Sequence, residues 1–133
     1  MSIGKFSLDT YYVFYVFRCL SMKKMDALQG SLDLLVLTIL SRRPKLHGYA
    51  LMTAIKETSG EVLSAEEGSL YPALHRMEEA GWIGAEWVVK ENGKRARIYE
   101  LTAAGEKQLA VEAMRWETVS SAINRVLRVL REA

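Results

Sequence analysis

Cysteine, histidine and proline are scarce in this sequence of 133 residues. Cys19 is the only cysteine, so the chain cannot form an internal disulfide, a CxxC pair or a thiolate-rich zinc site, and it is consistent with a reducing cytoplasm. Two histidines and three aspartates offer no catalytic triad, paired-carboxylate site or HExxH motif, and no glycine-rich phosphate loop is present. We therefore expect neither an enzyme nor a cofactor or metal site.

A hydrophobic run long enough to cross a membrane is also missing. The most apolar stretch, YYVFYVFRCL at 11–20, is about half of the ~20 residues that span a bilayer, and it contains Arg18. No A-x-A-like cleavage site follows it, so a signal peptide is a poor match. Residues 1–24 are either an extra element or translated upstream sequence with Met22 or Met25 as the working start. We prefer the second alternative and expect no membrane partner.

Positive charge is only in slight excess over the whole chain. The formal net charge of +2 does not identify an anionic partner, because nucleic-acid binding depends on a local basic patch. Such a patch lies at residues 90–97, where the net charge is +3. It contains Lys90, Lys94, Arg95 and Arg97 against Glu91. A concentration of cations of this kind can replace the counterions of phosphates.

Two helices are predicted after residue 25. Apolar residues between Leu28 and Leu40 occupy more than one side of a helix, which predicts a central core helix that ends near Ser41–Pro44. The second helix opens at His47-Gly48-Tyr49, runs for about three turns and closes around Ser59-Gly60. We expect His47 and Tyr49 to be structural, fixing the turn and packing the second helix, and Gly48 to allow a close approach.

The third predicted helix lies in EEGSLYPALHRMEEAGWI at 66–83. Leu70, Leu74 and Met77 form its buried stripe, and Gly81 ends it. A capping box from Ser64 to Glu67 would start the helix at Ala65, but Pro72 would then lie in the interior. We prefer a start near Gly68 or Ser69, which puts Pro72 in the first turn, where its missing N–H needs no partner. The outward face carries hydrogen-bonding side chains: Ser69, Tyr71, His75 and Arg76.

A β-hairpin and a long helix complete the pattern. Trp82–Val89 and Arg95–Leu101 flank an Asn-Gly turn, and the two tryptophans, Trp82 and Trp87, are expected to cover the core. Thr102 can cap a helix that continues to about Leu130. Its apolar residues recur at heptad spacing and imply a partner chain. The expected interface residues are Leu109, Ala113, Trp116, Ile123, Leu127 and Leu130.

This order of elements predicts a mainly α fold with a small β-hairpin, namely a winged helix-turn-helix. Residues 25–101 form this domain, residues 102–133 form a dimerisation helix, and residues 1–24 are an extension. In such folds the third helix enters the DNA major groove and the hairpin lies along the backbone. The expected DNA contacts are Ser69, Tyr71, Pro72, His75, Arg76, Lys94, Arg95 and Arg97. An alternative is a protein-interaction module, for which the outward face should be apolar.

The sequence resembles the PadR family of bacterial transcriptional regulators. The resemblance is carried by LQGSLDLLVLTIL at 28–40, HGYALMTAI at 47–55, GSLYPALHRMEEAGWI at 68–83 and RARIYELTAAG at 95–105. It implies a homodimer with one winged helix in each protomer. Dimerisation through residues 103–131 would place two DNA-contacting helices about one DNA turn, ~34 Å, apart, so we expect an inverted-repeat operator in double-stranded DNA. The resemblance also implies repression, in some relatives relieved by a small aromatic effector. The matching tryptophan in drug-sensing relatives lines a ligand pocket, so Trp116 is either packing or a ligand contact.

Two features depart from the family pattern. The second strand of the hairpin carries Ile98-Tyr99 where relatives often have two tyrosines, so one polar contact is expected to be lost. Residues 1–24 have no counterpart at the family's usual beginning, which agrees with translated upstream sequence.

Overall fold

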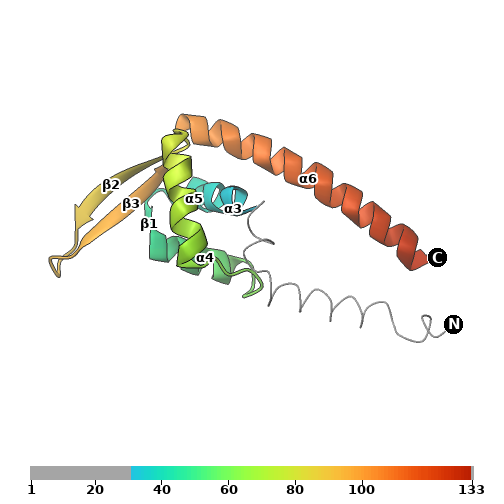
Figure 1. Cartoon of the computed structure of the whole chain (residues 1–133), viewed down its shortest axis with the longest axis horizontal. Coiled ribbons are helices and arrows are strands. Elements are labelled where there is room, and N and C mark those ends of the chain that lie inside the picture. Colours follow the sequence, from blue (N-terminus) through green and yellow to red (C-terminus); the bar gives the residue numbers. More distant parts are fainter. Residues whose placement is uncertain (1–30, 133) are drawn as a thin grey trace.

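The computed structural model describes residues 31–132 (Figure 1). The predictions for residues 1–24 and for the start of the first helix lie outside this range. The elements in chain order are α3 (Leu32–Arg42), β1 (Leu46–His47), α4 (Gly48–Thr58), α5 (Glu67–Glu79), β2 (Ile83–Val89), β3 (Arg95–Leu101) and α6 (Ala103–Glu132). The predicted fold class, mainly helical with a small antiparallel sheet, is confirmed.

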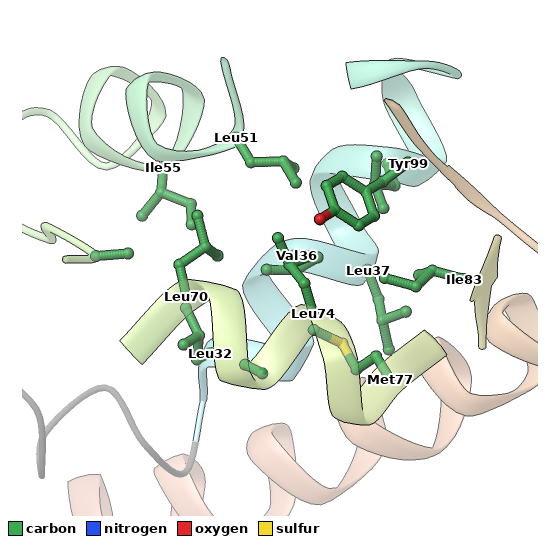
Figure 2. Close-up of a cluster of buried hydrophobic side chains, with 13 residues drawn as sticks. Leu32, Val36, Leu37, Leu51, Ile55, Leu70, Leu74, Met77, Ile83 and Tyr99 are labelled. Atoms are coloured by element: carbon green, nitrogen blue, oxygen red, sulfur yellow. The ribbon is translucent and has the colours of Figure 1, made fainter. Parts of the chain in front are cut away.

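The hydrophobic core forms where α3, α4 and α5 meet the base of the sheet (Figure 2). α3 buries side chains on more than one side, among them Leu32, Val36 and Leu37, as expected of a central helix. α5 contributes the predicted stripe, Leu70, Leu74 and Met77. α3 ends at Arg42 because Arg43, which precedes Pro44, is extended (φ −122°, ψ 108°).

α4 and α5 end in the same way, on a glycine with positive φ. In α5, the N–H of Gly81 donates to Glu78 O (3.0 Å) and the N–H of Trp82 donates to Met77 O (3.0 Å). Gly81 has a φ of +81°, a backbone conformation that residues with a Cβ rarely adopt. These are the paired bonds of a Schellman motif. Gly60 closes α4 equivalently, so both predicted helix ends are confirmed.

The start of α5 differs from both predicted starts. The helix begins at Glu67, and the N–H groups of Ser69 and Leu70 both donate to Glu66 O (3.0 and 2.9 Å). Glu66 occupies the N-cap position without a side-chain hydrogen bond, so no capping box forms. Pro72 is therefore inside the helix, in the second turn. Its missing N–H leaves the carbonyl of Gly68 without a helical donor, and Gly68 is exposed, so water can reach it.

The hairpin forms with the predicted strands, but a third strand was not expected. The strand order is β1-β3-β2, and Leu46 and His47 pair with Tyr99 and Ile98 of β3. Two residues are too few to show the alternation that identifies a strand in a sequence. His47 also caps α4, because its Nδ1 accepts from the N–H of Ala50 (3.2 Å), which confirms its structural role.

Two aromatic residues do not pack as expected. Trp82 lies against the core, but Trp87 is 56% exposed because β2 extends beyond the core. Tyr49 is 66% exposed, since it lies in the first turn of α4 on the side away from Leu51 and Ile55. The predictions that Trp87 covers the core and that Tyr49 packs α4 were therefore wrong.

α6 starts at a tight corner and then leaves the domain. Thr102 caps the helix as predicted: its Oγ1 accepts from the N–H of Gly105 (3.0 Å) and donates to Gly81 O (2.6 Å). α6 packs mainly against α3, and its distal end and the β2–β3 hairpin project to opposite sides of the helical core (Figure 1). No helix within residues 31–132 is long and apolar enough to span a membrane.

We predict that Gly105→Ala lowers the free energy of unfolding by about 1–3 kcal/mol, the usual cost of overpacking. Gly105 is buried, and a Cβ there would collide with the carbonyl oxygen of Trp82 and lie 2.6 Å from Leu101 Cδ1. Urea denaturation at fixed protein concentration measures the change. Gly68→Ala is the control: nothing lies within 4 Å of its Cβ position, so it should keep or slightly raise stability. Equal effects of both substitutions would contradict this packing.

Candidate nucleic-acid interface

The outward face of α5 is exposed, opposite the stripe that enters the core. Pro72 and His75 lie on the surface, and Tyr71 is 43% exposed. The imidazole of His75 lies 3.1 Å from a carboxylate oxygen of Glu79, one turn further along the helix. The first half of this face carries no acidic side chain after Glu67, so polyanions meet little repulsion there.

Tyr71 connects α5 to the N-terminus of α4. A Cβ on Gly48 would lie 2.7 Å from Tyr71 Oη, so the ring occupies the space that glycine leaves free. This confirms the predicted close approach at Gly48. The Tyr71 hydroxyl thus lies beside the first residue of α4, where backbone N–H groups and the helix dipole favour anions.

Ser69 and Arg76 are less available than Tyr71 and Pro72. Ser69 is half-buried, and its Oγ is enclosed without a hydrogen-bond partner among residues 31–132. Arg76 binds Asp33 of α3 with both terminal nitrogens (2.8 and 2.6 Å). A salt bridge with Glu78 or Glu79 of the same helix would be the local alternative for Arg76. The guanidinium pairs with Asp33 instead. The hydrogen bond to Asp33 raises the pKa of Arg76 above its ordinary value.

The carboxylates at the end of α5 are paired. Glu78 binds Arg97 of β3, and Glu79 lies against His75. Arg97 offsets the charge of Glu78 and so reduces its repulsion of phosphate, whereas His75 does the same for Glu79 only when the imidazole is protonated. The Glu78–Arg97 pair also joins the hairpin to the end of α5, because its two members lie on these two elements. Both side chains are about two-thirds buried.

The hairpin carries cations along one face and at its tip. Lys90, Lys94 and Arg95 are exposed, whereas Arg97 is half-buried. The tip is a tight turn in which the N–H of Lys90 donates to Lys94 O (2.8 Å) and Gly93 has φ +81°. The predicted basic patch is therefore a surface feature for three of its four cations.

The long helix leaves two apolar stripes uncovered. Most of the predicted stripe is accessible: Trp116 and Ile123 are each 53% exposed, and Ala113 and Leu130 are also exposed, whereas Leu109 and Leu127 are half-buried. The second stripe was not predicted and contains Val111, Met114, Val126 and Val129. Successive members are 3, 12 and 3 residues apart, which at ~100° per residue keeps all four within about 120° of one another around the helix, so a helical projection of the sequence would have identified the stripe.

A groove of about 450 Å³ lies between α3, the end of α4 and α6. Trp116 and Ala113 form its α6 wall, and Leu35 and Ile39 line the α3 side. Its walls are mainly apolar, with the hydroxyl groups of Thr38 and Ser120 among the polar groups. The volume lies within the range of small-molecule sites.

Three helices, of which α5 has a polar outward face, followed by a cationic hairpin, define a winged helix-turn-helix of the DNA-binding class. The chain belongs to the transcriptional regulator PadR-like family, whose model matches residues 36–111. Members of this family regulate transcription by binding DNA and are not enzymes.

Known relatives agree with this assignment. A transcriptional regulator from Clostridium thermocellum is 28% identical, with a TM-score of 0.69 over 75% of this chain and 96% of that one. A PadR-like transcriptional regulator from Bacillus cereus is 29% identical, with a TM-score of 0.64 over 77% and 96%. The negative transcriptional regulator PadR of Bacillus subtilis is 29% identical over 70 residues, which are 53% of this chain and 38% of that protein. The chain thus matches well under half of the Bacillus subtilis regulator.

We predict that Asp33→Ala and Arg76→Ala each lower the free energy of unfolding by about 1 kcal/mol, and that the double variant loses no more than either alone. The two charges form one bidentate pair between α3 and α5, so removing one partner removes the interaction. Urea denaturation of the four proteins gives the coupling energy. Additive losses would show that the pair does not act as a unit.

Proposed function

We propose that the protein is a cytoplasmic, homodimeric repressor that binds an inverted-repeat operator. The observation that carries the proposal is the exposed polar face of α5 beside a cationic hairpin, joined to a helix whose apolar stripes are left exposed by the other elements of residues 31–132. Repression is supported by the Bacillus subtilis relative, which is a negative transcriptional regulator. The family assignment supports DNA as the partner.

The contacts are divided between the two elements. Tyr71, Pro72 and His75 meet the major groove from the first half of α5, and Lys94, Arg95 and Arg97 meet phosphates. Ser69 and Arg76 complete the proposed set. Arg76 can contact DNA only if a phosphate replaces Asp33 as the partner of its guanidinium. Such a replacement is feasible because a phosphate can accept the same two hydrogen bonds that the Asp33 carboxylate accepts.

Dimerisation occurs through α6 in this proposal. Among residues 31–132, the distal end of α6 projects away from the helical core (Figure 1), and Ile123 and Leu130 are 53% and 56% exposed, so these apolar side chains and Leu127 beside them need a partner. A second copy supplies the same stripe about a two-fold axis. Two α5 helices then lie about one DNA turn, ~34 Å, apart, as an inverted repeat requires.

A small aromatic effector is a further part of the proposal. The groove beside Trp116 has the size of a ligand site, and the half-exposed indole offers a flat surface on which a planar molecule can stack. A ligand there would lie between the DNA-binding core and α6, where it could change their relative orientation.

The competing function is a protein-interaction module without DNA binding. That function favours an apolar outward face on α5, whereas Pro72 is flanked by the polar side chains of Tyr71 and His75. A gel-shift experiment with the DNA upstream of its own gene distinguishes the two. A shift that unrelated DNA does not compete away supports the regulator, and no binding to any duplex supports the alternative.

We predict that Arg95→Ala combined with Arg97→Ala weakens binding to every DNA duplex and makes the dependence of log K on log salt shallower by about 1–2. Each lost phosphate contact removes about 0.9 from the slope. Tyr71→Ala should in addition change the preference between operator and unrelated DNA. Fluorescence anisotropy over a salt series measures both effects, and an unchanged slope in the hairpin variant would remove the phosphate assignment.

We predict that Ile123→Asp converts the dimer to monomer, because it buries a carboxylate in an apolar seam. Sedimentation velocity at several protein concentrations measures the change. Ser121→Asp is the matched control, since Ser121 is exposed and lies on the opposite side of α6. An intact dimer in Ile123→Asp, or dissociation in both variants, would refute this interface.

A further inference from the structure

Trp87 is an exposed aromatic ring beside two arginines of the hairpin. The guanidinium carbons of Arg95 and Arg97 lie 5.2 and 5.3 Å from the centroid of its ring. Both distances are within the ~6 Å over which a cation is attracted to an aromatic face. The ring therefore contacts the cations that the proposed function assigns to phosphate, although it makes no part of the core.

The register of the hairpin explains this cluster. Trp87 pairs with Arg97, and the next pair on the same face is Val89 with Arg95. The same face carries Ile83 and Tyr99 at the base of the hairpin, where both enter the core. The cluster thus continues the core face of the sheet outward, beyond the last buried side chain.

The two arginines are in different electrostatic states. Arg97 is bound by Glu78, which offsets part of its charge and holds it against the end of α5. Arg95 is exposed. Among residues 31–132 its guanidinium lies against the Trp87 ring and forms no ion pair with a carboxylate. Arg95 therefore keeps its full charge available to a polyanion.

We propose that Trp87 is a positioning residue for DNA binding, which stacks on the guanidinium of Arg95 and holds it ready for a phosphate, while Arg97 and Glu78 fix the hairpin to α5. This inference rests on the phosphate contact in the proposed function. A guanidinium stacked by its face keeps its N–H edge free for bidentate bonds to an anion. Because the side chain is already ordered, less conformational entropy is lost on binding.

The test uses the full chain and a fluorescently labelled duplex from the DNA upstream of its own gene, titrated by anisotropy over a salt series. Trp87→Ala should weaken binding about two- to fivefold, which is the range that a cation–π contact at an exposed site supports. Trp87→Phe keeps an aromatic face and should bind nearly as well as the original protein. Arg95→Ala should weaken binding and make the salt slope shallower by about 0.9.

The decisive measurement is the DNA affinity of the double variant that combines Trp87→Ala with Arg95→Ala. If Trp87 acts through Arg95, Trp87→Ala has no further effect in the Arg95→Ala background. Val88→Ala is the matched control, because Val88 is exposed on the opposite face of the same strand, and it should leave affinity unchanged. Thermal unfolding of each variant verifies that the fold is kept, as the exposure of Trp87 leads us to expect.

Other outcomes overturn the inference in distinguishable ways. An unchanged salt slope in Arg95→Ala would defeat the phosphate contact itself, and the positioning role with it. A shallower slope in Arg95→Ala with no effect of Trp87→Ala would defeat only the positioning role. An equal loss from Trp87→Ala with and without Arg95 would mean that the ring contacts DNA independently.

Discussion

The corner at Gly81, Thr102 and Gly105 determines how the three functional parts of the molecule are placed. The Thr102 hydroxyl donates to the carbonyl of Gly81 at the end of α5, and accepts from the N–H of Gly105 at the start of α6. Gly105 then lies directly on the backbone of Trp82, at the base of the hairpin. α5, the hairpin and α6 therefore meet at one junction, and the direction of each depends on the other two.

Charge pairing organises the surface around this junction. Asp33 takes Arg76, Glu78 takes Arg97, and Glu79 faces His75. Arg76 and Arg97 each offset the charge of a carboxylate, while Lys94 and Arg95 remain exposed. The paired charges tie α5 to α3 and to β3, so they fix geometry, whereas Lys94 and Arg95 have no ion pair with a carboxylate of residues 31–132 and leave positive charge at the hairpin tip.

Local signals in the sequence were sufficient for most of the fold. Glycines at 60 and 81, the Asn-Gly turn and the Thr102 cap act within a few residues, and all four formed as predicted. Features that depend on distant residues could not be predicted. β1 exists because β3 offers it a partner, and Arg76 meets Asp33 across 43 positions of sequence.

The candidate site divides along the same line. The periodicity of α5 predicted which face is outward, but not that the Tyr71 ring would lie against Gly48. The aromatic character of Trp87 predicted burial, and only the length of the hairpin beyond the core placed it in solvent. The contacts assigned to DNA and to a second protomer remain predictions, because they concern molecules that the sequence of one chain does not specify.

The uncovered apolar sides of α6 have a consequence for how such a regulator responds to its own abundance. In the proposed assembly, the pairing of α6 helices makes stability and DNA competence depend on protomer concentration. Operator occupancy then falls more steeply than the total protein concentration, because dilution lowers that concentration and also the fraction of protomers that are paired. A modest decline in synthesis, or dilution by cell growth, could release a gene without any ligand.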